Sequence, residues 1–86
     1  MFKDIVITGA SSGIGCALSK HLSIHNKVYG ISRNRPKIKH QNFHFIKSDL
    51  SDLKNINKAI SKIKKADVLI NNAGTAMGRL ILLDKT

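Results

Sequence analysis

A glycine-rich segment, residues 9–15, constrains the fold of this chain more than any other feature of its sequence. The segment follows a short β-branched run, Asp4–Thr8, which predicts a buried strand. After it, apolar residues recur at the spacing of a helix: Ile14, Ala17, Leu18 and Leu22. A strand that turns through glycines directly into a helix is typical of a β-α-β unit.

The same alternation continues through the rest of the chain. Residues 27–31, 43–46 and 67–71 are predicted as three further strands, and residues 53–63 as a second helix. Apolar strands that alternate with helices form a parallel sheet. We therefore expect an α/β fold, a doubly wound parallel sheet of about four strands in the order 3-2-1-4 with two main helices on opposite faces. Ligands bind to such sheets at the carboxyl ends of the strands.

The helix ends can also be predicted from residue type. Ser51 is a candidate N-cap for the second helix, because its hydroxyl can accept from the free N–H groups of the first turn. Asn26 is expected to end the first helix in a left-handed conformation.

Composition limits the classes of protein to which the chain can belong. It has 86 residues, enough for one small domain, and a single Cys, which excludes an internal disulfide. Its apolar runs are too short for a transmembrane helix or a signal peptide, so we expect a soluble cytoplasmic protein without membrane contact. His21 and His25 are four residues apart, but no third ligand is visible, and we expect no metal site.

The formal charge of +10 suggests nucleic acid as a partner. The cations are spread along the chain, however, and only four aromatic residues are present. No stacking platform interleaved with basic residues is visible, so we do not expect nucleic acid to be the main partner.

The glycines are placed where a phosphate group could bind. Gly9 lets the chain turn sharply, while Gly13 and Gly15 let the backbone approach a pyrophosphate and the helix pack close to the sheet. The helix N-terminus adds free N–H groups and a partial positive charge. The alternative is a glycine turn with a purely structural role.

The spacing G-x-x-x-G-x-G in residues 8–15 resembles the cofactor motif of the short-chain dehydrogenase/reductase family. Asn71-Asn72-Ala73-Gly74 resembles that family's N-N-A-G, and Asp49-Leu50 resembles its adenine-contacting pair. The resemblance covers essentially the whole chain but only the first part of a typical member. It implies an incomplete NAD(P)-binding Rossmann domain over residues 1–86, with the catalytic and substrate-binding portion absent.

The resemblance implies a set of cofactor-binding residues: Gly9, Ser11, Ser12, Gly13, Ile14, Gly15, Ser32, Arg33, Asp49, Leu50, Asn71, Asn72, Ala73 and Gly74. Asp49 would accept from the adenine amino group, and residues 71–74 would pass beside the adenosine ribose. The alternatives are that Asp49 caps the second helix and that the asparagines form a structural turn.

The residue after the second strand decides between NADP(H) and NAD(H). NAD-type sites place an acidic residue there, which accepts from the ribose 2′-OH. This chain has Ser32-Arg33 instead, and no acidic residue between Asp4 and Asp49. A guanidinium can hold a 2′-phosphate through paired, charge-assisted hydrogen bonds. We therefore predict NADP(H) rather than NAD(H), the alternative being that Arg33 is an ordinary exposed cation.

By resemblance, a complete member carries a catalytic Ser and a Tyr-x-x-x-Lys pair. The single Tyr here, Tyr29, lies in the second strand and is followed four residues later by Arg33, so no catalytic residue can be assigned. We predict the NADP(H)-binding N-terminal part of an oxidoreductase that transfers hydride between NADPH and a carbonyl or alcohol substrate, homo-oligomeric in its full-length form. The alternatives are a non-catalytic nucleotide-binding module, an inactive gene remnant and a small basic nucleic-acid-binding protein.

Overall fold

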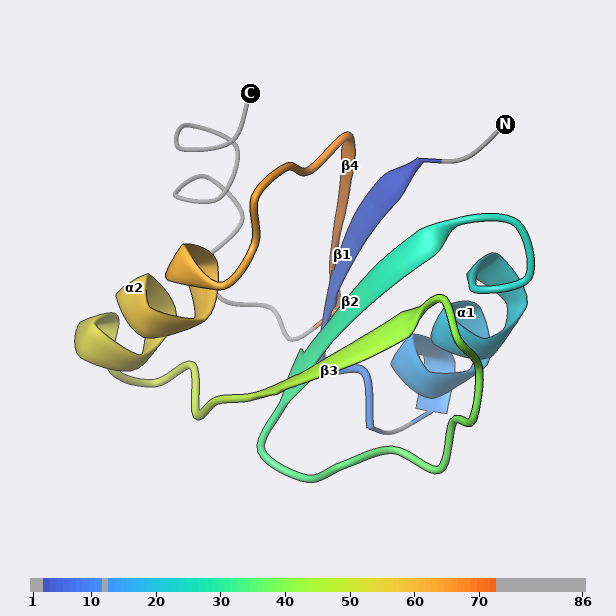
Figure 1. The fold of residues 1–86 in the computed structure, drawn as a ribbon. Helices are drawn as coiled ribbons and strands as arrows, with labels where there is room; N and C mark the ends of the chain where they lie inside the picture. Colours follow the sequence, from blue (N-terminus) through green and yellow to red (C-terminus); the bar gives the residue numbers. More distant parts are fainter. Residues whose placement is uncertain (1–2, 12, 73–86) are drawn as a thin grey trace.

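The computed structural model of the chain describes residues 3–11 and 13–72 (Figure 1). Strands and helices alternate from the first element to the last. In chain order they are β1 (Asp4–Thr8), α1 (Gly13–Leu22), β2 (Lys27–Ser32), β3 (Phe43–Lys47), α2 (Leu53–Ser61) and β4 (Val68–Asn71).

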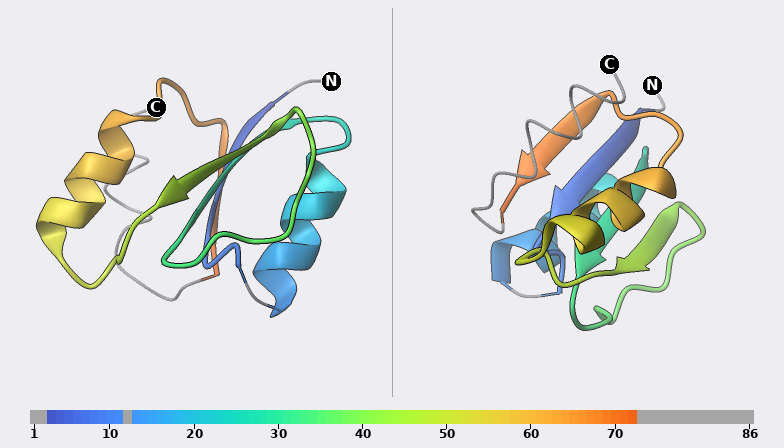
Figure 2. Two further views of the ribbon diagram at one scale, coloured as in Figure 1. Left: turned by 60° about the horizontal axis from the view of Figure 1, so that its bottom comes forward. Right: turned by 90° about the vertical axis from the view of Figure 1, so that its left-hand side faces the viewer.

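The four strands form one parallel sheet in the order β3-β2-β1-β4, which confirms the predicted strand order (Figure 2). In the register of the sheet, Ile5 of β1 lies opposite Val28 of β2 on one side and Val68 of β4 on the other. Val28 in turn lies opposite Phe43 of β3. The carboxyl ends of β1, β2 and β3 therefore meet at one edge of the sheet.

Each face of the sheet is covered by one helix, as the left view of Figure 2 shows. Successive side chains of a strand point to opposite faces. Ile5 and Ile7 consequently pack with Val28 and with Leu18 and Leu22 of α1. On the other face, Val6, Tyr29 and Ile31 of the sheet form one cluster with Ile56 and Ile60 of α2 and with Ile63, which follows it. Burying an aliphatic side chain of this size contributes about 1.5–3 kcal/mol, so these two layers hold both helices to the sheet.

The structure corrects two predicted helix ends. Asn26 is not left-handed, since no residue other than glycine has a positive φ in the described part of the chain. Its side chain instead accepts from the Lys3 N–H (3.2 Å) and donates to the Leu22 carbonyl (3.1 Å). The N-cap of α2 is Asp52 and not Ser51: Asp52 is extended, and its Oδ1 accepts from the Lys54 N–H at 2.8 Å.

The end of α1 also separates the two histidines considered as metal ligands. The helix ends at Leu22, so His25 lies beyond it and does not share a helix face with His21. Within residues 3–11 and 13–72, no group of three His, Cys, Asp or Glu side chains is placed to hold a metal ion. In the same residues, no helix is long and apolar enough to cross a membrane.

Candidate functional site

Two glycines of the segment between β1 and α1, Gly9 and Gly15, have the conformation and packing that the sequence predicts. Gly9 adopts a φ of 68°, and its N–H donates to the Ile31 carbonyl of β2 at 2.9 Å. Gly15 lies against Gly9, and a Cβ at this position would overlap the Gly9 carbonyl oxygen. α1 can therefore begin close to the sheet only because residue 15 has no side chain.

Gly13 differs from Gly15, because it faces open space. Its φ is 49°, and a Cβ added there would meet no heavy atom within 4 Å. Gly13 is also the first residue of α1, whose first N–H groups have no partner within the helix. An anion could approach the backbone here and accept from these N–H groups.

A cavity of about 340 Å³ lies at the carboxyl ends of β1, β2 and β3. It brings together six of the predicted cofactor-binding residues: Gly9, Ser11, Ser32, Arg33, Asp49 and Leu50. Ile31, Asn34 and Ser48 complete its lining. The cavity thus combines the glycine loop, a guanidinium and a carboxylate from three successive strand ends.

Five of the other predicted residues lie elsewhere in the described part of the chain. Gly13, Ile14, Gly15, Asn71 and Asn72 lie outside its lining, and Ile14 is 70% exposed. Ser12, Ala73 and Gly74 fall outside the described residues. The predicted contacts of all fourteen residues with a cofactor stay predictions.

Ser48 was not predicted as a site residue, yet it connects the strand ends that form the cavity. Its N–H donates to the Ser32 carbonyl (2.9 Å) and its hydroxyl donates to the Asn55 carbonyl of α2 (3.2 Å). Ser32 in turn donates its hydroxyl to the Asn34 carbonyl (2.7 Å), which fixes the turn that carries Arg33. The only sequence signal was the position of Ser48 between a predicted strand and Asp49.

The carboxylate of Asp49 is held in its ionised form. Its Oδ1 accepts from the Ser51 N–H at 3.1 Å. Hydrogen bonds from the backbone and hydroxyl of Ser51 lower the pKa of Asp49 below its usual value, and the nearby charge of Arg33 lowers it further. Because Asp52 caps α2, Asp49 is not the N-cap, and it is available as an acceptor at the cavity.

The two asparagines link β4 to β1. The Thr8 hydroxyl donates to Asn71 Oδ1 at 2.9 Å, and Asn72 Nδ2 donates to the Gly9 carbonyl at 3.2 Å. The second bond holds the residue at which the glycine loop turns. Their observed role is to fix the position of the loop.

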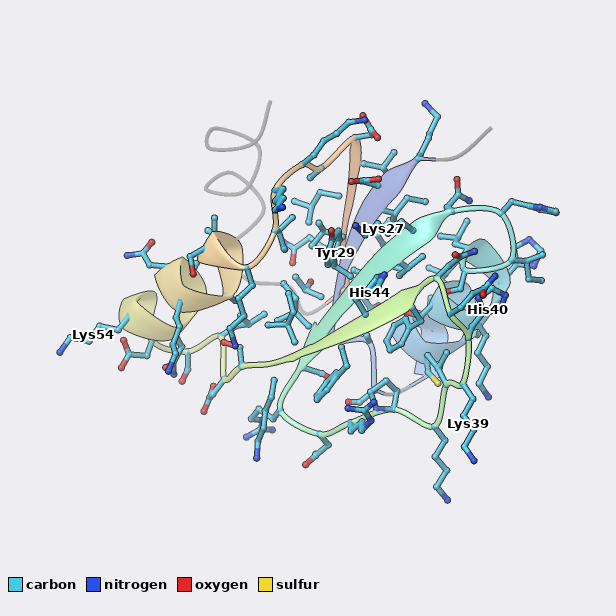
Figure 3. All side chains as sticks on the ribbon, in the orientation of Figure 1. Lys27, Tyr29, Lys39, His40, His44 and Lys54 are labelled. Atoms are coloured by element: carbon cyan, nitrogen blue, oxygen red, sulfur yellow. The ribbon has the colours of Figure 1, made fainter. Side chains whose placement is uncertain are left out.

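Tyr29 lies away from the cavity, on the face of the sheet that α2 covers (Figure 3). It is buried, with its ring centroid 5.5 Å from that of His44 and 5.2 Å from Lys27 Nζ. The hydrogen bond with Tyr29 raises the pKa of Lys27. None of these three side chains lines the cavity, so they are not placed to act on a ligand there.

Among models of known protein families, the family model described as short chain dehydrogenase matches residues 3–85 of the sequence. The chain belongs to the short-chain dehydrogenase family. Its fold is the dinucleotide-binding fold of that family, and the cavity lies where this fold binds ligands, at the carboxyl ends of the strands.

Individual relatives of this short-chain dehydrogenase chain agree with the match. It is 43% identical over 74 residues to a coniferyl-alcohol dehydrogenase from Pseudomonas sp. (strain HR199 / DSM 7063), covering 84% of this chain and 28% of the relative. A crystal structure of a short chain dehydrogenase family protein from Francisella tularensis subsp. tularensis SCHU S4 superimposes with a TM-score of 0.75 at 26% identity, covering 84% of this chain and 31% of that one.

A second solved structure, a short chain dehydrogenase from Leptospira borgpetersenii serovar Hardjo-bovis, has NAD⁺ bound. It superimposes with a TM-score of 0.75 at 28% identity and covers 83% of this chain and 31% of that one. The chain thus spans about a third or less of the length of these relatives.

Proposed function

We propose that this chain binds NADP(H) in the cavity at the carboxyl ends of β1, β2 and β3. The observation that carries the proposal is the meeting of Arg33 and Asp49 beside Gly9 in one cavity. A dinucleotide site needs hydrogen-bond donors to the phosphates, a group that recognises the base and a group that contacts the ribose, all within reach of each other. Here the loop at the start of α1 offers the first, Asp49 the second and Arg33 the third.

Arg33 supports the preference for NADP(H) over NAD(H). It lines the cavity directly after β2, and its turn is fixed by the hydrogen bond from the Ser32 hydroxyl to the Asn34 carbonyl. A guanidinium at this place would neutralise the charge of a 2′-phosphate, whereas NAD(H) has no such group. The Leptospira relative has NAD⁺ bound, so the choice of cofactor differs within the family on this proposal.

The whole protein is proposed to be an NADP-dependent oxidoreductase, cytoplasmic and homo-oligomeric, acting on a carbonyl or alcohol substrate. When bound, the nicotinamide ring supplies the hydride. The acid/base pair implied by the resemblance, Tyr-x-x-x-Lys, does not occur in these 86 residues. The chain's own part is to bind and orient the cofactor, and the other functions considered from the sequence gain no support from the comparisons.

The variant Arg33→Asp tests this assignment. It places a carboxylate against the 2′-phosphate, so the dissociation constant of NADPH should rise about tenfold or more, while that of NADH should change less than about threefold. Both constants can be measured by titrating the chain with each nucleotide and following nucleotide fluorescence.

Arg35→Asp is the matched control, because it makes the same change of charge two residues away. The Arg35 guanidinium lies over the Phe45 ring, 5.4 Å from its centroid, and does not line the cavity. This control should keep its preference for NADPH. Equal weakening of NADPH and NADH by Arg33→Asp, or no weakening of either, would show that Arg33 does not hold a 2′-phosphate.

A further inference from the structure

A second cavity, of about 280 Å³, lies between the end of β3 and α2. It adjoins the cavity in which we propose that NADP(H) binds, called the nucleotide cavity below, because Ser48 and Asp49 line both cavities. Its other lining residues come from the end of β3 and from one side of α2: Lys47, Asn55, Lys58, Ala59 and Lys62.

Positive charge dominates the lining of this second cavity. Three exposed lysines, Lys47, Lys58 and Lys62, line it together with a single carboxylate, that of Asp49. In the part of the chain that the structure describes, the ion pair within 4.0 Å is Lys65–Asp67, so none of these three lysines is neutralised by a carboxylate. Three like charges around one hollow repel each other unless an anion occupies it.

The helix dipole explains only part of this arrangement. Lys58 is in the last turn of α2 and Lys62 is its C-cap, where a cation stabilises the helix terminus. That reason does not apply to Lys47, which ends β3. Lys54, in the first turn of α2, does not line the cavity and points away from the fold in Figure 3. The lysines of α2 are therefore not equivalent, and those near Lys47 surround the hollow.

We propose that this second cavity binds a compact phosphate-bearing anion, a phosphate or diphosphate group, separately from the nucleotide. Lysine ammonium groups bind phosphate as mobile point charges, and Ser48 and Asn55 add polar groups to the lining. At about 30 Å³ for each water, the cavity has room for a compact anion such as a diphosphate. The site goes beyond the proposed function: it shares Ser48 and Asp49 with the first cavity but does not use the glycine loop or Arg33.

Inorganic pyrophosphate is the probe for this test. The 86-residue chain is titrated by calorimetry as the unsubstituted protein, as Lys58→Gln/Lys62→Gln, and as Lys20→Gln/Lys54→Gln, in which two exposed lysines outside the cavity are replaced. Lys58→Gln/Lys62→Gln should raise the dissociation constant of pyrophosphate about tenfold, since two direct charge contacts are lost. The control pair has the same net charge and should raise it less than about twofold.

Two further titrations separate this cavity from the nucleotide cavity. The dissociation constant of pyrophosphate should be unchanged in Arg33→Gln and in the chain saturated with NADPH. In the unsubstituted chain, the amide resonances that shift on titration should be those of residues 47–49, 55, 58, 59 and 62. This mapping does not depend on the stability of any variant.

Three results would overturn the proposal: equal weakening by the two lysine pairs, competition by NADPH, or amide shifts confined to the glycine loop. The first would mean that pyrophosphate responds to net charge alone, and the other two that it occupies the nucleotide cavity. Failure of the proposed function would instead show as an unselective response to Arg33→Asp, so the two failures are distinguishable.

Discussion

At the scale of single residues, Gly15 controls how closely α1 approaches the loop that follows β1. A Cβ at Gly15 would overlap the Gly9 carbonyl oxygen and would lie 2.9 Å from the Gly9 carbonyl carbon. It would also lie 2.7 Å from Asn72 Nδ2, which donates to that same carbonyl oxygen. The absence of a side chain at Gly15 therefore permits both the start of α1 close to the loop and the hydrogen bond from Asn72 to Gly9.

Gly15→Ala should lower the free energy of unfolding by about 1–3 kcal/mol, because backbone atoms of Gly9 must move to admit the methyl group. Gly30→Ala is the comparison, since a Cβ at Gly30 would lie 2.5 Å from the Phe43 ring and 2.9 Å from Ala10 Cβ, so that it meets side chains and not a backbone carbonyl. Gly30→Ala should lower the free energy of unfolding by less than Gly15→Ala does. Urea denaturation of both variants measures the difference, and equal costs would contradict the role of the Gly9 backbone.

The sequence predicted the positions of residues in the fold well where local geometry decides, and poorly where distant backbone groups decide. Gly9 and Gly15 followed from their spacing, and Arg33 and Asp49 from their places after predicted strands. Ser48 was missed because its bonds run to Ser32 and Asn55, and no local pattern indicates such partners. The second cavity was missed for the same reason, since only the fold brings Lys47 beside α2.

At the scale of elements, α2 shows which features of a helix can be predicted from its sequence. The apolar stripe suggested a helix to residue 63, but α2 ends at Ser61, and Ile63 is buried beyond it with its N–H donating to the Ile60 carbonyl at 3.0 Å. Its apolar period was predicted correctly because the stripe packs on the sheet. Its ends depend on single hydrogen bonds, which neighbouring polar residues can make equally well.

Asp52→Ala should lower the free energy of unfolding by about 0.5–2 kcal/mol, because the Lys54 N–H loses its acceptor in a helix of only nine residues. Ser51→Ala, one residue earlier, should cost less than about 0.5 kcal/mol. Urea denaturation followed by circular dichroism at 222 nm, the usual helix signal, measures both. A larger loss for Ser51→Ala would restore Ser51 as the residue that starts α2.

At the scale of the whole molecule, positive charges greatly outnumber the carboxylates that can pair with them. The sequence has 15 Lys and Arg against 5 Asp and Glu. The carboxylate of Asp67 accepts from the Asp4 N–H at 2.9 Å and lies 3.5 Å from Lys65 Nζ, so it joins the start of β1 to the approach to β4. The Asp4 hydrogen bond lowers the pKa of Asp67, and Lys65 and Lys3 lower it further.

The stability of the fold should therefore decrease in acid. Because Asp67 and Asp49 have lower pKa values in the folded chain than the usual 3.8, their contribution is present above that value and is lost as the pH falls through their folded-state pKa values. Asp67→Asn should melt at a lower temperature than the unsubstituted chain at about pH 7, with the gap narrowing towards about pH 2. Thermal melts at several pH values measure this, and a gap independent of pH would exclude the charge of Asp67 as its cause.

The central place of β1 in the sheet also affects the order in which the molecule folds. Three hydrogen bonds, Asp4 to Asp67, Thr8 to Asn71 and Asn72 to Gly9, each join residues 63 positions apart. Closing so long a loop is slow compared with forming a local helix. During synthesis, β1 can pair with β2 early, but the glycine loop receives its last restraint only after Asn72 has left the ribosome. The cavity beside the glycine loop is therefore among the last parts of this segment to take its final shape.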